Sequence, residues 1–221
     1  MFEAVLFDLD GTLADTAPDL GKALNRLRQD EGLPVLAHDL LRPYTSQGVR
    51  GLLRVGFGID PEHPDYGRLS ARFLEFYAED ICSETRLFDG IPELLVALEN
   101  AAIPWGIVTN KRTRFTTPVV AALGLSQRTI CVVSGDTTPM PKPSPLPLLH
   151  ACGLLGCRPE STLFVGDDRR DIEAGRAAGT RTAAVSYGYL GDGGSPTDWQ
   201  ADFIADHPLE LLDYVLGARR A

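Results

Sequence analysis

Short apolar runs alternate with helix-like segments along most of the 221-residue chain. Each run is too short for a helix and ends in polar residues, which is typical of a strand buried on both faces of a sheet. Gly124 and Gly179 follow two of the helix-like segments, where glycine commonly ends a helix. The alternation predicts an α/β fold with a doubly wound, mainly parallel, Rossmann-like sheet. The expected strands cover residues 4–7, 105–108, 130–133, 162–165 and 182–185, and the expected helices cover residues 91–101, 115–123, 145–152 and 171–178.

One long segment departs from this alternation. From about residue 16 to residue 88 the pattern of apolar positions is helical throughout. We therefore predict an all-helical cap domain at residues 16–88, inserted into an α/β core domain formed by residues 1–15 and 89–221. Its aromatic stripe could stack on a ligand, but helical spacing favours a place in the hydrophobic core. The residues that define the helical faces are Leu20, Leu24 and Leu27 on one and Leu69, Phe73, Phe76 and Tyr77 on the other.

Composition and charge narrow the class of protein. A formal net charge of -9 and the lack of a basic run argue against a protein that binds nucleic acid or an anionic membrane. No apolar stretch is long enough to cross a bilayer and no basic leader precedes the first apolar run, so we predict a cytoplasmic protein. The four cysteines lack paired metal-ligand spacing and are expected to be buried or idle thiols. The sequence leaves open whether the chain is a monomer or a homodimer.

Two aspartates follow the first predicted strand. Asp8 and Asp10 are two positions apart, and extended geometry points such residues to the same side of the chain. An ordinary turn is the alternative interpretation, because Asp10 is followed by Gly11. If the strand is part of an open α/β sheet, both carboxylates face the crevice where such sheets bind ligands.

A second group of aspartates follows the predicted strand at residues 162–165. Asp167, Asp168 and Asp171 precede or begin a predicted helix, and capping of that helix explains one of them but not three. Two unit charges about 4 Å apart repel by roughly 4 kcal/mol at an effective dielectric near 20. We therefore expect a cation where the two acidic groups meet, and carboxylate ligands favour Mg²⁺.

Two further segments are suited to binding an anion. Thr109, Asn110 and Lys111 follow the strand at 105–108, where hydroxyl, amide and free backbone N–H groups form an anion pocket or, alternatively, an ordinary helix N-cap. Lys142 lies among closely spaced prolines that stiffen its backbone ahead of a helix. Its ammonium group is a candidate phosphate ligand, and a surface lysine in a proline-rich loop is the alternative.

Taken together, these four segments resemble the haloacid dehalogenase superfamily of phosphatases over essentially the whole chain. The motifs that carry the resemblance, in that superfamily's order and at comparable spacing, are DLDGT, TNK, PKPSP and GDDRRD. The opening VLFDLDGTLADTAPDL and the helical insert are similar to the phosphoglycolate phosphatase branch. The segment VGDDRRDIEAGRAAGTRTAAVSYGY also resembles a sub-branch that acts on N-acetylmuramic acid 6-phosphate.

The resemblance implies a role for each matching residue. Asp8 would be the nucleophile and a metal ligand, and Asp10 would act as acid and then as base while its carbonyl oxygen also binds the metal. Asp167 would complete the Mg²⁺ site, with Asp171 supporting it directly or through water. The residues implied to bind the phosphoryl group are Gly11, Thr109, Asn110 and Lys142.

The segment from Thr45 to Arg50 is expected to join two helices of the cap and to reach into the site, with Arg50 meeting an anionic substrate. An ordinary helix-helix turn is the alternative. The expected substrate is a small phosphorylated metabolite, first 2-phosphoglycolate and second N-acetylmuramic acid 6-phosphate. A sugar phosphomutase is a further alternative, and so is a non-catalytic protein that senses phosphate.

Overall fold

The computed structural model describes residues 2–191 and 193–217. Its main sheet has six strands in the order β5-β4-β1-β6-β7-β8, and every neighbouring pair is parallel. Strands β4 and β5 lie on one side of β1, and strands β6, β7 and β8 lie on its other side. The fold is therefore the doubly wound α/β sheet predicted from the sequence. The strands are β1 (Ala4–Phe7), β4 (Trp105–Val108), β5 (Val132–Val133), β6 (Thr162–Gly166), β7 (Arg181–Val185) and β8 (Phe203–Ala205).

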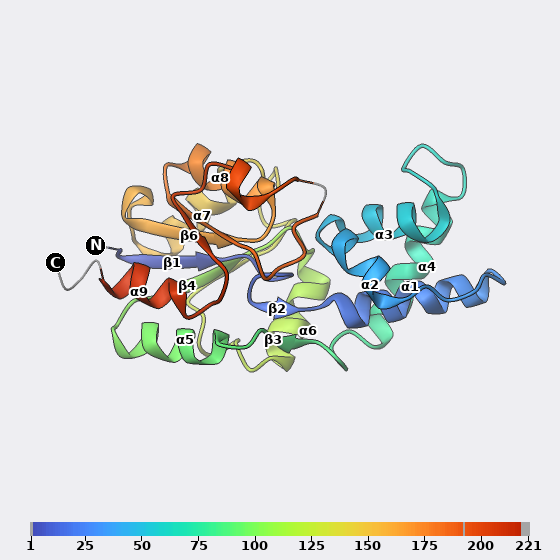
Figure 1. The fold of residues 1–221 in the computed structure, drawn as a ribbon, viewed down its shortest axis with the longest axis horizontal. Helices are drawn as coiled ribbons and strands as arrows, with labels where there is room; N and C mark the ends of the chain where they lie inside the picture. The colour runs from blue at the N-terminus through green and yellow to red at the C-terminus, as the bar shows by residue number, and fades with distance from the viewer. Residues whose placement is uncertain (1, 192, 218–221) are drawn as a thin grey trace.

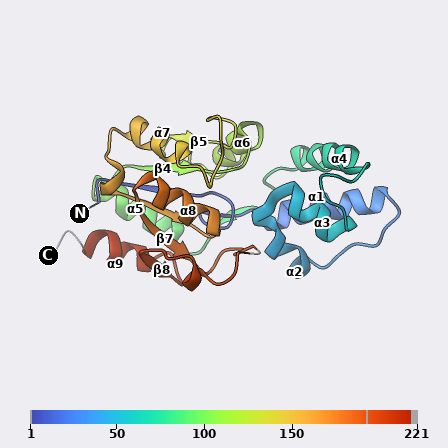
Figure 2. The ribbon, with the colours of Figure 1, turned by 90° about the horizontal axis from the view of Figure 1, so that it is seen from above.

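Helices cover both faces of this sheet (Figures 1 and 2). One buried cluster joins the sheet to α5, α6 and α9, and another joins it to α7 and α8. Burial on both faces explains why the central strands are continuous apolar runs. These helices are α5 (Ile91–Asn100), α6 (Thr113–Ala122), α7 (Leu146–Leu155), α8 (Arg169–Ala178) and α9 (Glu210–Gly217).

A separate group of helices, here called the helical region, lies beyond the carboxyl ends of the strands (Figure 1). It has its own buried hydrophobic cluster, which includes the predicted stripe of Phe73, Phe76 and Tyr77, each at most 2% exposed. The stripe therefore belongs to a core, as expected. The region consists of α1 (Ala17–Asp30), α2 (His38–Leu41), a 3-10 helix (Arg42–Gln47), α3 (Gly48–Phe57) and α4 (Tyr66–Glu79).

The chain enters and leaves the helical region through a two-stranded antiparallel ladder. Strand β2 (Ala14–Asp15) pairs with β3 (Arg86–Leu87). The expectation that residues 16–88 are helical throughout is therefore wrong for residues 86–87, which form a strand. The buried carboxylate of Asp19 joins the two connections, because it accepts hydrogen bonds from the Ser83 hydroxyl (2.8 Å) and the Thr85 amide (2.8 Å).

Several element boundaries differ from the predicted ones. The strand predicted at 130–133 is shortened to Val132–Val133, and Ile130 is 60% exposed. Helix α8 begins at Arg169 rather than at residue 171, because Asp168 supplies its N-cap. The segment from Thr45 to Arg50 is not a loop, since it ends a 3-10 helix and begins α3. Strand β8 and helix α9 were not predicted.

No helix among the described residues has the length and hydropathy needed to cross a bilayer. The four cysteines are free thiols. Burial raises the pKa of Cys131 to about 11 and that of Cys152 to about 12, so both are protonated and unreactive near neutral pH.

Candidate active site

Three buried carboxylates meet where β1 and β6 end. Asp8 follows β1, Asp167 follows β6, and Asp171 lies in the first turn of α8. Each offers an oxygen, and these oxygens lie within 4.8 Å of one another. The structure therefore brings together the two acidic groups that the sequence predicted to share one site.

Glycines allow the backbone to approach these carboxylates. A Cβ at Gly11, whose φ is +88°, would lie 2.2 Å from Asp167 Oδ2. A Cβ at Gly188 would lie 2.3 Å from Asp167 Cβ, and one at Gly166 would lie 2.4 Å from Asp171 Oδ2. Side chains at these positions would displace the carboxylates, so the acidic cluster depends on glycines from three segments. Gly188 was not among the predicted site residues, because it lies outside the four motifs.

The acidic cluster is electrostatically strained without a further cation. Burial, followed by the charges of Asp8 and Asp171, raises the pKa of Asp167 well above its usual value. Burial also raises the pKa of Asp171 to about 7, although the Lys142 ammonium acts to lower it. Fully buried carboxyl groups whose charged forms are this unfavourable are suited to binding a metal ion.

Lys142 is the cation that faces the cluster. Its Nζ atom lies 2.8 Å from Asp8 Oδ1 and 2.7 Å from Asp171 Oδ1, and it donates to the Val108 carbonyl at 2.8 Å. The residue is 3% exposed, so the surface-lysine alternative is wrong. Burial acts to lower the pKa of Lys142, but the two carboxylates outweigh it and raise that pKa, which keeps the ammonium charged.

The side chain of Asn110 holds the backbone of Lys142 in place. Its Nδ2 donates to the Lys142 carbonyl and its Oδ1 accepts from the Lys142 amide, both at 2.9 Å. Thr109 is buried, and its hydroxyl accepts from the Lys111 amide at 3.2 Å. Both residues line the same cavity as Asp8, so the TNK and PKPSP segments meet as expected. The amide of Asn110 is occupied by this pairing, which gives it a positioning function in the structure.

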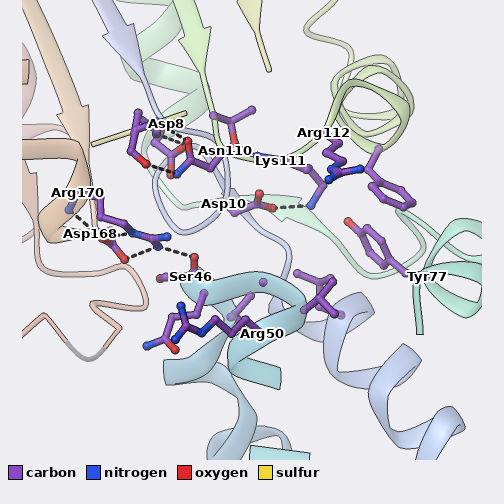
Figure 3. Close-up of a pocket in the computed structure, with 18 of the residues that line it drawn as sticks. Asp8, Asp10, Ser46, Arg50, Tyr77, Asn110, Lys111, Arg112, Asp168 and Arg170 are labelled. Atoms are coloured by element: carbon purple, nitrogen blue, oxygen red, sulfur yellow. Dashed lines mark hydrogen bonds and ion pairs between the residues drawn. The ribbon is translucent and has the colours of Figure 1, made fainter. Parts of the chain in front are cut away.

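Asp10 lies on the same wall of the cavity as Asp8, and its side chain pairs with Lys111 rather than with the acidic cluster (Figure 3). Its Oδ1 accepts from the Thr16 hydroxyl at 2.6 Å and from the Lys111 ammonium at 2.9 Å. The buried Lys111 also lies 4.8 Å from the ring centroid of Tyr77 in α4. Burial acts to lower the pKa of Lys111, but the Asp10 carboxylate outweighs it and raises that pKa. Sequence reasoning placed Lys111 only within an anion pocket and missed its pairing with Asp10.

The residues of the cluster fit a hard divalent cation. Asp8, Asp167 and Asp171 supply only oxygen ligands, and Mg²⁺ binds a few carboxylates while water and phosphate oxygens complete its shell. Neither a thiolate nor an imidazole belongs to this group, so its chemistry does not favour zinc.

A cavity of about 360 Å³ separates the acidic cluster from the helical region. Asp8, Asp10 and Lys142 line its core side. Ser46 and Arg50 face Asp8 and Asp10 from the helical region (Figure 3). The predicted approach of residues 45–50 to the site is therefore what the structure shows. The cavity residues that sequence reasoning missed include Arg112, Phe115 and Arg170. Asp168, which belongs to the second predicted acidic group, also lines the cavity.

Tyr189 was also missed, because its contacts come from distant segments. Its amide donates to Asp167 Oδ2 at 2.8 Å, and its hydroxyl accepts from the amides of Thr16 (2.6 Å) and Ala17 (2.9 Å). Tyr189 thus connects the acidic cluster to the start of α1. The only sequence signal was an aromatic residue shortly after a predicted strand.

Comparison with known proteins agrees with this geometry. The family profile of haloacid dehalogenase-like hydrolases matches residues 5–185. The N-acetylmuramic acid 6-phosphate phosphatase of Pseudomonas aeruginosa is 46% identical over 96% of this chain and 93% of its own length. A phosphoglycolate phosphatase of Xanthomonas campestris pv. campestris is 42% identical over 95% of each chain.

A solved structure shows the same fold. The predicted phosphoglycolate phosphatase from Haemophilus somnus superposes with a TM-score of 0.85 at 29% identity, over 96% of this chain and 97% of its own. Both curated relatives are named phosphatases, which supports the predicted enzyme class of phosphoric monoester hydrolase. The match over residues 5–185, together with relatives above 40% identity, establishes that the chain belongs to the haloacid dehalogenase-like hydrolase family.

Proposed function

We propose that this phosphomonoester hydrolase transfers the phosphoryl group of its substrate to Asp8 and then to water, with Mg²⁺ bound by Asp8, Asp167 and Asp171. The observation that carries the proposal is the position of Lys142. Its buried ammonium lies within 2.8 Å of both Asp8 and Asp171, beside a cluster of three carboxylates whose charge requires another cation. Such a site combines a nucleophile with positive charge for the phosphoryl oxygens.

In the first step, an Asp8 carboxylate oxygen attacks phosphorus and forms an acyl phosphate while the ester P–O bond breaks. Asp10 gives its proton to the departing alkoxide. In the second step, Asp10 takes a proton from water, the water oxygen attacks phosphorus, and the bond to Asp8 breaks to release inorganic phosphate. Lys142 stabilises negative charge on the phosphoryl oxygens in both steps. Bound Mg²⁺ supplies further charge neutralisation at those oxygens.

The hydrogen bonds of Asp10 fix the position of its carboxyl group and leave one oxygen for proton transfer. Lys111 and Thr16 both donate to Oδ1 and hold the carboxyl group beside the cavity, so Oδ2 is the oxygen that we assign to the exchanged proton. The carbonyl oxygen of Asp10 as a metal ligand, and Gly11 and Thr109 as phosphoryl ligands, belong to the same proposal. Their support is that Asp8 and Asp10 of the DLDGT segment and all three residues of the TNK segment line the cavity, and that Gly11 directly follows Asp10.

We also propose that residues 16–88 act as a cap domain over a core domain of residues 1–15 and 89–221. The helical region has a hydrophobic cluster of its own and joins the core through the β2–β3 ladder. A cap that covers the cavity excludes bulk water from the acyl phosphate. Three residues of the cap line the cavity within reach of a substrate: Ser46, Arg50 and Tyr77.

The proposed substrate is a small phosphorylated metabolite that also carries a carboxylate. Arg50 is exposed on the cap side of the cavity and makes no ion pair within 4.0 Å with the carboxylates in the described part of the chain. A guanidinium group in that position suits a second anionic group on the substrate. 2-Phosphoglycolate has such a group and is the first candidate, in agreement with the name of the Xanthomonas campestris relative.

N-Acetylmuramic acid 6-phosphate is the second candidate, and the size of the cavity favours it. A volume of about 360 Å³ exceeds what a two-carbon acid fills. Val49, Leu74 and Phe115 add apolar surface to the wall, which suits the carbon skeleton of a larger molecule. The Pseudomonas aeruginosa relative carries the name of this activity.

The test is phosphate release from both compounds, with and without Mg²⁺, by the native chain and by Asp8→Asn. We expect Mg²⁺-dependent release that Asp8→Asn abolishes, and the ratio of kcat/KM values identifies the preferred substrate. Activity that survives the substitution would exclude the acyl phosphate. Transfer of phosphate to a bound sugar, without release to water, would identify a phosphomutase instead.

A further inference from the structure

Arg170 connects helix α8 directly to the backbone of the cap (Figure 3). Its Nη2 donates to the Ser46 carbonyl at 2.7 Å. The same guanidinium donates to both carboxylate oxygens of Asp168, from Nε at 2.8 Å and from Nη2 at 2.8 Å. A bidentate pair of this kind fixes the orientation of the guanidinium plane, so the donor that points at Ser46 has a defined direction.

Asp168 is itself held by the start of α8. Its Oδ1 accepts from the Arg170 amide at 2.9 Å, and its own amide donates to Asp171 Oδ2 at 3.1 Å. The carboxylate that orients Arg170 is thus part of the same helix N-terminus that supplies Asp171 to the acidic cluster. A displacement of the cap at Ser46 is therefore transmitted to residues beside the metal site.

Ser46 contacts the acidic cluster with its side chain as well. Its hydroxyl donates to Asp167 Oδ2 at 3.4 Å, while its carbonyl accepts from Arg170. On the opposite side of the cavity, the cap meets the core through the rings of Tyr77 and Phe115, whose centroids are 5.5 Å apart. Aromatic pairs pack over centroid separations of about 4.5–7 Å, whereas a hydrogen bond from a charged donor is confined to about 2.7–2.9 Å, so the contact of Arg170 defines the approach of the cap more narrowly.

We propose that Arg170 is a positioning residue that holds the cap closed over Asp8 through the carbonyl of Ser46, an inference that rests on the proposed function of the cavity as the site of phosphoryl transfer. Opening of the cap breaks a hydrogen bond from a charged donor, and closure restores it on a guanidinium already oriented by Asp168. The closed state is favoured, and a substrate that binds under the cap is retained until the reaction has occurred.

The experiment compares Arg170→Gln with Arg169→Gln, a matched change one residue away. Arg169 pairs with Glu173 on its own helix at 2.8 Å, and its side chain is 61% exposed. Hydrogen exchange of backbone amides in residues 42–50 reports opening of the cap, and kcat/KM with Mg²⁺ reports its consequence. We expect about tenfold faster exchange in Arg170→Gln and a fall of similar size in kcat/KM, mostly through KM. Arg169→Gln should match the native chain in both measurements.

Two more variants separate orientation from charge. Asp168→Asn keeps a side chain that favours the N-cap position but loses the charged pair, so it should speed exchange in residues 42–50 less than Arg170→Gln does. Arg170→Lys keeps the positive charge but cannot form the bidentate pair with Asp168, so it should give an intermediate exchange rate in residues 42–50. Equal exchange rates in Arg170→Gln and Arg169→Gln would overturn the proposal, whatever their activities.

The exchange measurement does not depend on the identity of the substrate. If the native chain releases no phosphate from either compound while Arg170→Gln still accelerates exchange, the proposed function fails and the link between Arg170 and the cap stands. If the native chain is an active phosphatase and exchange in residues 42–50 is unchanged in Arg170→Gln, the link fails and the proposed function stands.

Discussion

The two walls of the cavity are built in different ways. Deep in the core wall, cations and carboxylates are paired: Lys142 with Asp8 and Asp171, and Lys111 with Asp10. On the cap wall, Arg50 makes no comparable ion pair within the described residues. Paired charges on the core wall hold reacting groups in place before a substrate arrives, whereas an unpaired guanidinium is completed by the substrate itself.

The two regions also differ in where their ion pairs lie. Both are supported by buried apolar clusters, but the ion pairs within the helical region lie at the surface, such as the pair of Arg72 with Asp30, whose side chains are 43% and 48% exposed. Surface pairs of this kind contribute little to stability. The comparison teaches that chemistry and support are separable here, since buried charge serves the reaction on the core wall and apolar packing supports both regions.

The largest expected effect comes from removing charge from the core wall. Lys142→Met should lower kcat/KM by about 10³-fold, because the phosphoryl oxygens lose a buried cation. It should also destabilise the metal-free protein by about 3 kcal/mol, since the carboxylates of Asp8 and Asp171 lose their partner. Steady-state kinetics and urea unfolding measure the two effects.

The control for Lys142→Met is the same substitution on the cap. Lys22→Met removes an ion pair with Asp80 in which the Lys22 side chain is 49% exposed. We expect no measurable change in kcat/KM. Equal effects of the two substitutions would contradict the distinction between the walls.

The next effect concerns stability alone. Leu24 is fully buried in the hydrophobic cluster of the cap and does not line the cavity. Leu24→Ala should cost about 2–4 kcal/mol of unfolding free energy because it leaves a cavity in the cap. At a temperature where the variant is folded, kcat should stay within about twofold of the native value. Leu24→Met keeps the volume and is the control, and a large fall in kcat for Leu24→Ala would show that packing and chemistry are coupled.

A smaller effect is expected from pH. The pKa of Asp171 in the folded protein is raised to about 7, so this group favours the metal-free fold at low pH and loses that contribution as pH rises from about 4 to 7. Mg²⁺ binding requires the ionised carboxylate. Affinity for Mg²⁺ should therefore fall about tenfold between pH 8 and pH 6, measured by calorimetric titration. An affinity that does not change with pH would mean that Asp171 is ionised throughout this range.

The smallest effect tests recognition by the cap. Arg50→Gln should raise KM about fivefold for a substrate with a carboxylate and leave p-nitrophenyl phosphate unaffected, because that ester lacks the second anionic group. Arg54→Gln, one turn further along α3, is the control. An equal rise in KM for both compounds would show that Arg50 acts on the phosphoryl group, and the difference between the walls would disappear.

The sequence predicted the core of this molecule better than its connections. The strands at residues 4–7 and 105–108 were predicted with their observed bounds, because both are short apolar runs buried on both faces. Strands β2 and β3 have two residues each, and they form only because distant segments pair. Strand β8 is at the edge of the sheet and has only three residues, so its apolar run was too short to predict a strand.

The same limit applies to the site. Asp8 and Asp167 were placed together because each follows a strand, and parallel strands end at a common edge. The contacts of Lys111 and Arg170 depend on which side chains of the cap face the core, and local patterns do not encode that arrangement. Tyr189 is a further case, because the backbone amides that donate to its hydroxyl lie more than 170 positions away along the chain.

The narrow connection between the two regions has a consequence for design. Both crossings of the chain lie side by side in a ladder of two residue pairs, and Asp19 ties them together. A different insert that keeps this short ladder can in principle be grafted between residues 15 and 86 without interrupting any strand of the main sheet. Such an insert would change the helical side of the cavity and leave Asp8, Asp167 and Asp171 in place, which makes this junction a suitable point for building chimaeric enzymes.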